Sequence, residues 1–371
     1  MGAGCFLPGI GTRTRWPPGN DHPARAHDVR PAGAAAYRGL YRSTGLRDEP
    51  IVASGIIVVP HGPAPEGGRP IVAWAHPTTG IVPRCAPSLA IFHFQQMQGL
   101  RNMVERGYIV AATDYPGLGT VGPHPYLVGV SEGRAVLDSV RAARGIAGAG
   151  GTNRFGVWGH SQGGQAVLYA GLLAESYTPE MTLVGVAAAA PATDLATLLD
   201  DDLKSAGGKN ITAMTLWSWS RVYGAAITQV VEPSAMPVVD HLAEECIESI
   251  FDWLIRQRIE RPLEQSFLSI KNLATVEPWR SLALRNTPGP LPSSVPVFLA
   301  QGAADELVRP SVTENYMTDL CRAGSKVRMM LLPGVGHLSV GRDSADAAVQ
   351  WMADRFAGVS PPSDCAAKQY P

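Results

Sequence analysis

The sequence predicts an α/β protein with a doubly wound, mostly parallel sheet and an inserted helical cap. Three observations support this fold class. Short apolar runs of strand length alternate with helical segments along most of the chain. Several of these runs are apolar at every position, which is typical of parallel strands covered on both faces. One stretch of the chain, residues 194–285, contains no strand-like run.

The expected strands and helices alternate along the chain. Strands are expected at residues 51–59, 71–75, 108–113, 155–158, 183–190, 295–300 and 327–332. Helices are expected at residues 92–106, 132–145, 163–174, 312–322 and 344–356. Ser344 would cap the last helix, because it precedes an apolar face that carries Trp351 and Phe356. This order favours a parallel sheet with right-handed crossovers.

The domain organisation follows from composition. Residues 1–36 are rich in Gly, Pro, Arg and Ala without hydrophobic periodicity, so we expect a disordered or loosely packed leader. Its apolar stretch is too short for the apolar region of a signal peptide and is broken by proline, so no signal peptide is visible. Residues 37–193 and 286–371 would form the core. Residues 194–285 would form a helical cap or lid that supplies an apolar pocket; a structural subdomain remote from the site is the alternative.

The charge balance argues against two classes of partner. Among 371 residues, 31 are Lys or Arg and 32 are Asp or Glu, giving a formal net charge of −1. There is no basic stripe, so nothing favours nucleic acid. No apolar run is long enough to cross a bilayer, and stable membrane insertion is therefore not expected.

The residues 159–163, Gly-His-Ser-Gln-Gly, follow an apolar strand and precede an apolar helix. This arrangement is typical of the nucleophile elbow of an α/β-hydrolase fold. The turn leaves no room for side chains at the two glycines, and it holds Ser161 in a strained backbone conformation. The amide of Gln162, at a helix N-terminus, would face an oxyanion. A glycine-rich turn without chemistry is the alternative.

A serine nucleophile needs a base, which in this fold follows it in the chain. Only His241 and His337 follow Ser161. His241 lies within the helical insertion, whereas His337 follows the last expected strand in a loop of small residues. We therefore expect His337 to be the base, with a surface loop histidine as the alternative.

The third member of a catalytic triad, after the serine and the histidine, should be an acidic residue that follows a later strand. Asp305 follows a strand and a glycine turn, which would place its carboxylate near the far nitrogen of His337. Asp194 is the runner-up, Asp114 comes too early in the chain, and Glu306 should point elsewhere.

The loop after residues 71–75 should supply the second oxyanion donor. Its backbone amides at Thr79 or Gly80 are the candidates, and the residue pattern does not choose between them. His76 would be a structural histidine that supports this loop.

The five cysteines show no CxxC pair and no zinc-type spacing. All but Cys5 lie in the expected folded part, so they could form two disulfides or remain buried thiols.

Several further motifs occur in the chain before the elbow. They are Ala-His-Pro-Thr-Thr-Gly at 75–80, Cys-Ala-Pro-Ser at 85–88, Asp-Tyr-Pro-Gly-Leu-Gly at 114–119, His-Pro-Tyr-Leu at 124–127 and Ser-Glu-Gly-Arg-Ala-Val-Leu-Asp at 131–138. Together they resemble the secretory lipase family of α/β hydrolases, typified by fungal lipase A, and especially its bacterial branch. The resemblance covers residues 37–365.

The resemblance implies a catalytic triad of Ser161, Asp305 and His337, in agreement with the choice made from the residues. It also implies two disulfides, which would be Cys85–Cys246 and Cys321–Cys365, and a secreted or periplasmic protein. One departure concerns the oxyanion loop. Bacterial relatives tend to carry Gly where this chain has Pro77. The fungal member uses an acidic side chain in this loop, and no acidic residue lies between His76 and Cys85 in this chain.

We therefore expect a carboxylic ester hydrolase, an esterase or lipase, that acts on apolar acyl or aromatic esters through an acyl-enzyme. Neither a cofactor nor a metal is expected, and the partner would be a small-molecule or lipid ester. The aromatic residues Trp217, Trp219 and Tyr126 are candidates for the substrate pocket. A serine amidase or peptidase of the same fold, or a catalytically silent ligand-binding fold, is the alternative.

Overall fold

A computed structural model describes residues 14–15, 31–247 and 250–365. Most of the expected leader therefore lies outside the described residues, as does Cys5. The expected boundary at residue 36 differs slightly from the structure, because a regular strand already begins at Ala34.

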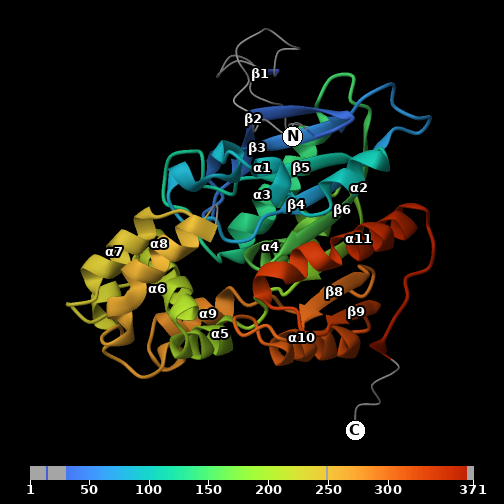
Figure 1. The fold of residues 1–371 in the computed structure, drawn as a ribbon. Helices are drawn as coiled ribbons and strands as arrows, with labels where there is room; N and C mark the ends of the chain where they lie inside the picture. Colours follow the sequence, from blue (N-terminus) through green and yellow to red (C-terminus); the bar gives the residue numbers. More distant parts are fainter. Residues whose placement is uncertain (1–13, 16–30, 248–249, 366–371) are drawn as a thin grey trace.

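The described residues form a nine-stranded sheet with the order β1-β2-β3-β5-β4-β6-β7-β8-β9 (Figure 1). The strands are β1 (Thr14–Arg15), β2 (Ala34–Thr44), β3 (Pro50–Pro60), β4 (Arg69–Ala75), β5 (Ile109–Thr113), β6 (Gly151–His160), β7 (Thr182–Ala189), β8 (Val297–Gly302) and β9 (Val327–Leu332). Pairing is antiparallel from β1 to β5 along this order and parallel from β5 to β9. The mostly parallel α/β-hydrolase sheet is thus confirmed.

The register of the parallel strands brings their carboxyl ends to one edge. Ala75 of β4 pairs with Gly159 of β6, and the following His160 pairs with Ala189 of β7. Gly302 of β8 pairs with Leu332 of β9. Segments that follow β4, β6, β8 and β9 therefore begin close together in space, although they lie far apart in the sequence.

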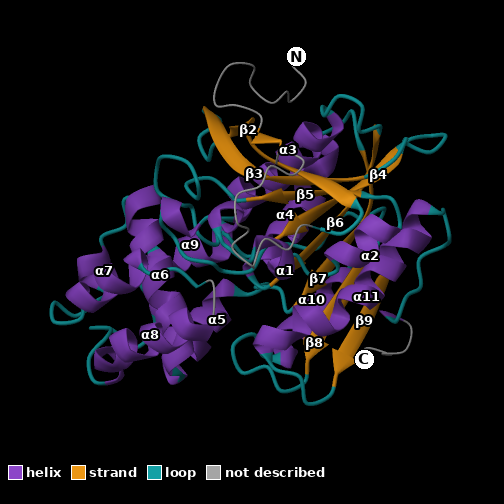
Figure 2. Cartoon of the chain, turned by 45° about the horizontal axis from the view of Figure 1, so that its top comes forward, coloured by secondary structure: helices purple, strands orange, loops and turns teal. Residues whose placement is uncertain are grey.

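Helices cover both faces of the sheet (Figures 1 and 2). The core helices are α1 (His93–Gln96), α2 (Leu100–Glu105), α3 (Gly129–Arg144), α4 (Gln162–Tyr177), α10 (Pro310–Arg322) and α11 (His337–Phe356). Helices α3 and α4 pack together on one face, whereas α2 and α11 cover the other. The continuous apolar runs of β4 and β6 are buried between these layers, as expected for parallel strands.

The expected cap on the last helix is wrong. Helix α11 begins at His337, with the extended Gly336 before it, so Ser344 lies inside the helix. There its hydroxyl donates to the carbonyl of Val340, 2.7 Å away. The buried face of α11 already includes Val340, in the first turn of the helix.

The described residues between 194 and 285 are mostly helical, as their lack of strand patterns predicts, and they lie together at one side of the sheet (Figure 1). The elements are α5 (Leu195–Asp201), η3 (Asp202–Lys204), α6 (Ala206–Val222), η4 (Ile227–Gln229), α7 (Met236–Glu244), α8 (Ile250–Glu260), η5 (Arg261–Glu264), η6 (Leu273–Thr275) and α9 (Trp279–Arg285). We call this stretch the helical segment. Among the described residues, no helix is long and apolar enough to span a membrane.

Two disulfides tie distant parts of the chain. Cys85, in the short helix η1 (Pro83–Cys85), is bonded to Cys246 of the helical segment. Cys321 of α10 is bonded to Cys365 near the C-terminus. These are the two pairs that the family resemblance implied.

Candidate active site

The turn between β6 and α4 has the backbone of a nucleophile elbow. Ser161 has φ 58° and ψ −118°, a conformation that non-glycine residues rarely adopt. A Cβ at Gly163 would lie 2.0 Å from the carbonyl oxygen of Ala75, and one at Gly159 would lie 2.2 Å from the carbonyl oxygen of Gly163. Only glycine permits this close approach, so the sequence pattern and the strained turn require each other.

The structure brings Ser161, His337 and Asp305 into one hydrogen-bonded chain. The hydroxyl oxygen of Ser161 lies 2.8 Å from Nε2 of His337. Nδ1 of the same imidazole lies 2.8 Å from Oδ2 of Asp305. The three residues stand at the carboxyl edge of the sheet, where β6, β8 and β9 end.

Asp305 is buried and held by several donors. Its Oδ1 accepts hydrogen bonds from the amides of Leu307, at 3.0 Å, and Val308, at 2.9 Å. The side chain of Gln301 donates to Oδ2 at 3.3 Å. These contacts leave the carboxylate oriented toward His337.

The residues that the sequence analysis considered and did not choose for the triad lie elsewhere in the fold. Asp194 caps helix α5, where it accepts from the amide of Thr197 at 3.1 Å. Asp114 is buried and accepts from the hydroxyl of Ser54 at 2.6 Å. Glu306 is exposed. His241 is also exposed, and its imidazole lies 3.7 Å from Glu245.

His160 contacts the backbone of His337, a role that the sequence pattern did not reveal. Its Nε2–H donates to the carbonyl of His337 at 3.0 Å, and the two rings lie 5.1 Å apart between centroids. Burial lowers the pKa of His160 to about 3, so its ring is neutral. This contact holds the first residue of α11 against the last residue of β6, directly before Ser161.

The side chain of Gln162 belongs to a buried polar cluster with Glu132 and His124. Its amide nitrogen donates to Glu132 at 2.8 Å and to Nε2 of His124 at 3.0 Å. Burial raises the pKa of Glu132 to about 8 and lowers the pKa of His124 to about 3. Both groups are therefore neutral near pH 7, and the cluster is a hydrogen-bonded support rather than an ion pair.

In the loop after β4, Thr78 lines the pocket beside Ser161. Its hydroxyl lies 2.8 Å from the hydroxyl of Tyr126. Gly80 instead lies against the Cys85–Cys246 disulfide, and the carbonyl of Thr79 accepts from Ile247 at 2.8 Å. Neither Thr79 nor Gly80 lines this pocket, whereas Thr78, which the sequence analysis did not single out, does. Whether the backbone amide of Thr79 or Gly80 serves as the oxyanion donor stays a prediction.

His76 is buried, as expected for a structural histidine. Its Nδ1–H donates to the carbonyl of Pro77 at 2.7 Å, and its ring lies 4.2 Å from that of Tyr115. Burial lowers the pKa of His76 to about 4.

A narrow cavity of about 30 Å³ adjoins Ser161. It is lined by Thr78, Tyr126, Leu127, Ser161, Gln162, Ala192, Leu195, Leu198, Leu199, Asp202, Ile211, Leu307 and Val308. A water molecule needs at least roughly 10–15 Å³ of such space, so the cavity has room for about two waters. We call it the serine pocket.

Of the expected aromatic pocket residues, Tyr126 lines the serine pocket, but Trp217 and Trp219 do not. Trp219 is fully buried behind Tyr126 and donates to its carbonyl at 2.9 Å. Trp217 donates to Asp240 at 3.1 Å and stacks under the guanidinium of Arg221. The prediction placed both indoles in the substrate pocket, but neither lines the serine pocket. They pack α6 against the core and its neighbours instead.

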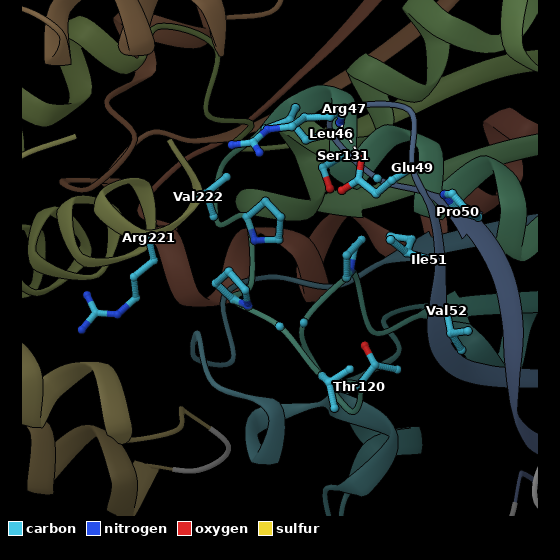
Figure 3. Close-up of a pocket in the computed structure, with 17 residues that line it drawn as sticks. Leu46, Arg47, Glu49, Pro50, Ile51, Val52, Thr120, Ser131, Arg221 and Val222 are labelled. Carbon is cyan, nitrogen blue, oxygen red and sulfur yellow. Dashed lines mark hydrogen bonds between the residues drawn. The ribbon is translucent and has the colours of Figure 1, made fainter. Parts of the chain in front are cut away.

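A larger and more open pocket of about 550 Å³ lies away from Ser161 (Figure 3). Leu46, Arg47 and Glu49 border it from the connection between β2 and β3, and Val222 borders it from the end of α6. Thr120 lies on the loop opposite them. None of the triad candidates lines it.

Comparisons with known proteins bear on the family and the fold of this chain. A family model described as secretory lipase matches residues 90–364. The chain is 26% identical to the secreted triacylglycerol lipase LIP7 of Malassezia globosa, covering 95% of this chain and 78% of that protein. It is 24% identical to a Mycobacterium tuberculosis protein named "Probable inactive lipase", covering 88% of this chain and 75% of the relative.

Solved structures share the fold at low sequence identity. The closed state of Candida antarctica lipase A matches with a TM-score of 0.75 and 18% identity, covering 90% of this chain and 80% of that one. The cell wall degrading esterase LipA of Xanthomonas oryzae matches with a TM-score of 0.73 and 18% identity, covering 88% and 91%.

Proposed function

Since the chain belongs to the secretory lipase family of ester hydrolases, we propose that Ser161, His337 and Asp305 are its catalytic triad. The observation that carries this proposal is the unbroken hydrogen-bonded chain from the Ser161 hydroxyl through His337 to Asp305, at 2.8 Å for each contact. The strained backbone at Ser161 supports the same assignment.

In the first step, Nε2 of His337 takes the hydroxyl proton while Ser161 Oγ attacks the ester carbonyl. Asp305 keeps the proton of His337 on Nδ1, so that Nε2 is free to act as the base. A tetrahedral intermediate forms and its carbonyl oxygen carries the negative charge.

The backbone amide of Gln162, at the N-terminus of α4, is the first oxyanion donor in this proposal. Pro77 has no N–H, so the second donor must come from elsewhere in the loop. Thr78 is favoured because it lines the serine pocket and because Tyr126 holds its hydroxyl. Loss of one such donor typically costs about 3 kcal/mol of barrier.

Collapse of the intermediate transfers the proton from His337 to the leaving alcohol and leaves an acyl group on Ser161. Water then attacks this acyl-enzyme with His337 again acting as base. The acid leaves, and the serine regains its proton.

The lining of the serine pocket supports a class of substrate. Its leucine, isoleucine and valine side chains suit an apolar acyl or aromatic group, and several of them come from the helical segment. The cavity is too small for most acyl chains unless the side chains that line it move. Because several of those side chains belong to residues 194–285, we infer that this segment acts as a cap over the site. The two disulfides fit the oxidising surroundings of a secretory family.

The test compares wild type with Ser161→Ala on p-nitrophenyl acyl esters and matched anilides. We expect the variant to lose at least about a thousandfold in kcat, with an unchanged circular dichroism spectrum. Ser176→Ala, an exposed serine further along α4, is the control and should retain activity. Turnover in Ser161→Ala at the wild-type rate would overturn the triad. Faster cleavage of anilides than of esters would favour the amidase alternative.

A further inference from the structure

Asp202 places a carboxyl group in the wall of the otherwise largely apolar serine pocket. The residue is 5% exposed, and it lines the cavity together with Ser161 and Thr78. In the part of the chain that the structure describes, its side-chain oxygens form no hydrogen bond or ion pair with another protein group. Its oxygens are not among the fully buried side-chain atoms that lack a partner, so they keep some access to the open space of the pocket. A ligand in the pocket can therefore supply the hydrogen-bond partner that the protein does not.

The position of Asp202 is fixed by its neighbours. It opens η3 between α5 and α6, and Gly208 packs so closely on its carbonyl that an added Cβ would lie 2.3 Å away. The cations nearby are engaged by the preceding residue: Asp201 lies 2.6 Å from Lys204 and 3.3 Å from Arg309. Asp202 therefore faces the cavity without an ion-pair partner of its own.

The charged groups around this carboxyl favour its neutral form. Burial raises the pKa of Asp202 well above its ordinary value, and the carboxylates of Asp201 and Asp305 raise it further. Arg309 opposes them but contributes less. A neutral carboxylic acid offers one O–H donor and an acceptor oxygen on the same group.

An alcohol hydroxyl matches that pair of functions, since it also donates once and accepts. Much of the remaining wall offers apolar contact, from Leu195, Leu198, Leu199, Ile211, Leu307 and Val308. An unsubstituted alkyl group entering the pocket would displace water and leave the carboxyl unsatisfied. A hydroxylated group would satisfy it while its carbon atoms contact the leucines.

We propose that Asp202 selects esters that carry a hydroxyl group on the part that enters the serine pocket. This inference rests on the proposed ester hydrolysis by Ser161. The hydroxyl can belong to the acyl chain or to the alcohol, and the two sources are distinguished by separate substrate pairs.

The test measures kcat/KM for two pairs of esters in which a hydroxyl replaces a methyl group. The acyl pair is methyl β-hydroxybutyrate and methyl isovalerate. The alcohol pair is glycol monobutyrate and propyl butyrate. For wild type we expect a preference of about ten- to hundredfold for the hydroxylated ester in one pair, which is the size of effect that leaving a buried polar group unpaired produces.

Asp202→Leu should lower this ratio at least about tenfold, by raising KM for the hydroxylated ester and improving turnover of the alkyl ester. Asp202→Asn keeps a donor and an acceptor and should retain most of the preference. It also covers the case in which the leucine variant fails to fold. Asp200→Leu, on the more exposed side of α5, is the matched control and should keep the wild-type ratio.

The proposal is overturned if wild type shows no preference in either pair, or if Asp202→Leu leaves the ratio unchanged. An equal loss on both esters of a pair would assign Asp202 to support of Asp305 or of the fold, and would likewise overturn it. Failure of the underlying function is distinguishable, since wild type would then hydrolyse none of the four esters and Ser161→Ala would change nothing.

Discussion

A carboxyl oxygen of Glu132 lies 2.8 Å from the side-chain amide nitrogen of Gln162, and both residues are almost fully buried. The same oxygen accepts from the backbone amide of Leu127 at 2.9 Å. Leu127 has a positive φ of 53° and follows Tyr126 in the wall of the serine pocket. Glu132 thus joins the residue after Ser161 to the turn that holds Tyr126.

This contact predicts a pH dependence of stability. Burial raises the pKa of Glu132 to about 8, from an ordinary value of 4.5. The folded protein therefore holds a proton that the unfolded chain releases. The stability from this group is fully present below pH 4.5 and is lost as the pH rises through about 8, with a slope of up to about 1.4 kcal/mol per pH unit.

Glu132→Gln should remove this contribution. We expect its free energy of unfolding, measured with urea between pH 5 and 8 (roughly the window in which this group titrates), to fall less steeply than that of wild type. Glu175→Gln, at an exposed position of α4, serves as the control. Equal slopes for Glu132→Gln and wild type would show that Glu132 is ionised in the folded protein.

Three buried histidines predict the opposite trend in acid. Burial lowers the pKa of His76 to about 4, and those of His124 and His160 to about 3, from 6.5. Each is neutral when folded and takes up a proton on unfolding. Their contribution is present above pH 6.5 and is lost as the pH falls, by up to about 1.4 kcal/mol per pH unit for each ring.

His160→Asn tests one of these rings while keeping a donor for the carbonyl of His337. Unfolding followed from pH 6.5 to 4.5 should show a shallower loss of stability in this variant than in wild type. His241→Asn, on the exposed side of α7, keeps all three buried imidazoles and should follow wild type. A His160→Asn slope that matches wild type contradicts the assignment of a neutral ring.

The core of the fold and the triad candidates could be predicted because parallel strands end at one edge. Ser161, Asp305 and His337 each follow a strand, so their local patterns already imply proximity. Strand β2 was not predicted, because it mixes small, polar and aromatic residues without clear alternation and is only partly buried.

The pocket could not be predicted in the same way. Asp202 lines the same pocket as Ser161 and Thr78 because the helical segment packs against the loop after β4, and no local pattern encodes that packing. For the same reason Trp217 and Trp219 looked like pocket residues. The sequence shows that they are aromatic. It does not show that α6 directs them toward the core and toward Asp240.

The Cys85–Cys246 disulfide should matter for both stability and activity. It joins residues 161 positions apart, a loop worth about 5 kcal/mol in the chain-entropy model. It also packs against Gly80, which lies in the same loop as Thr78. We expect Cys85→Ser/Cys246→Ser to lower the free energy of unfolding by several kcal/mol and to reduce kcat/KM for p-nitrophenyl esters.

The other disulfide provides the comparison. Cys321→Ser/Cys365→Ser opens a loop of 44 residues, worth about 4 kcal/mol in the same model, between α10 and the C-terminal segment. It should lower stability and leave kcat/KM close to wild type under conditions where the protein is folded. Equal activity losses in the two double variants would argue that the first disulfide has no specific effect on the oxyanion loop.

The central claim is that His337 activates Ser161 as the nucleophile. The most direct measurement is labelling with a fluorophosphonate followed by peptide mapping, in wild type, Ser161→Ala and His337→Asn. The triad predicts one label per chain, located on Ser161, no label in Ser161→Ala, and labelling slowed at least about a hundredfold in His337→Asn. Labelling of a different serine, or an equal rate in His337→Asn, would contradict it.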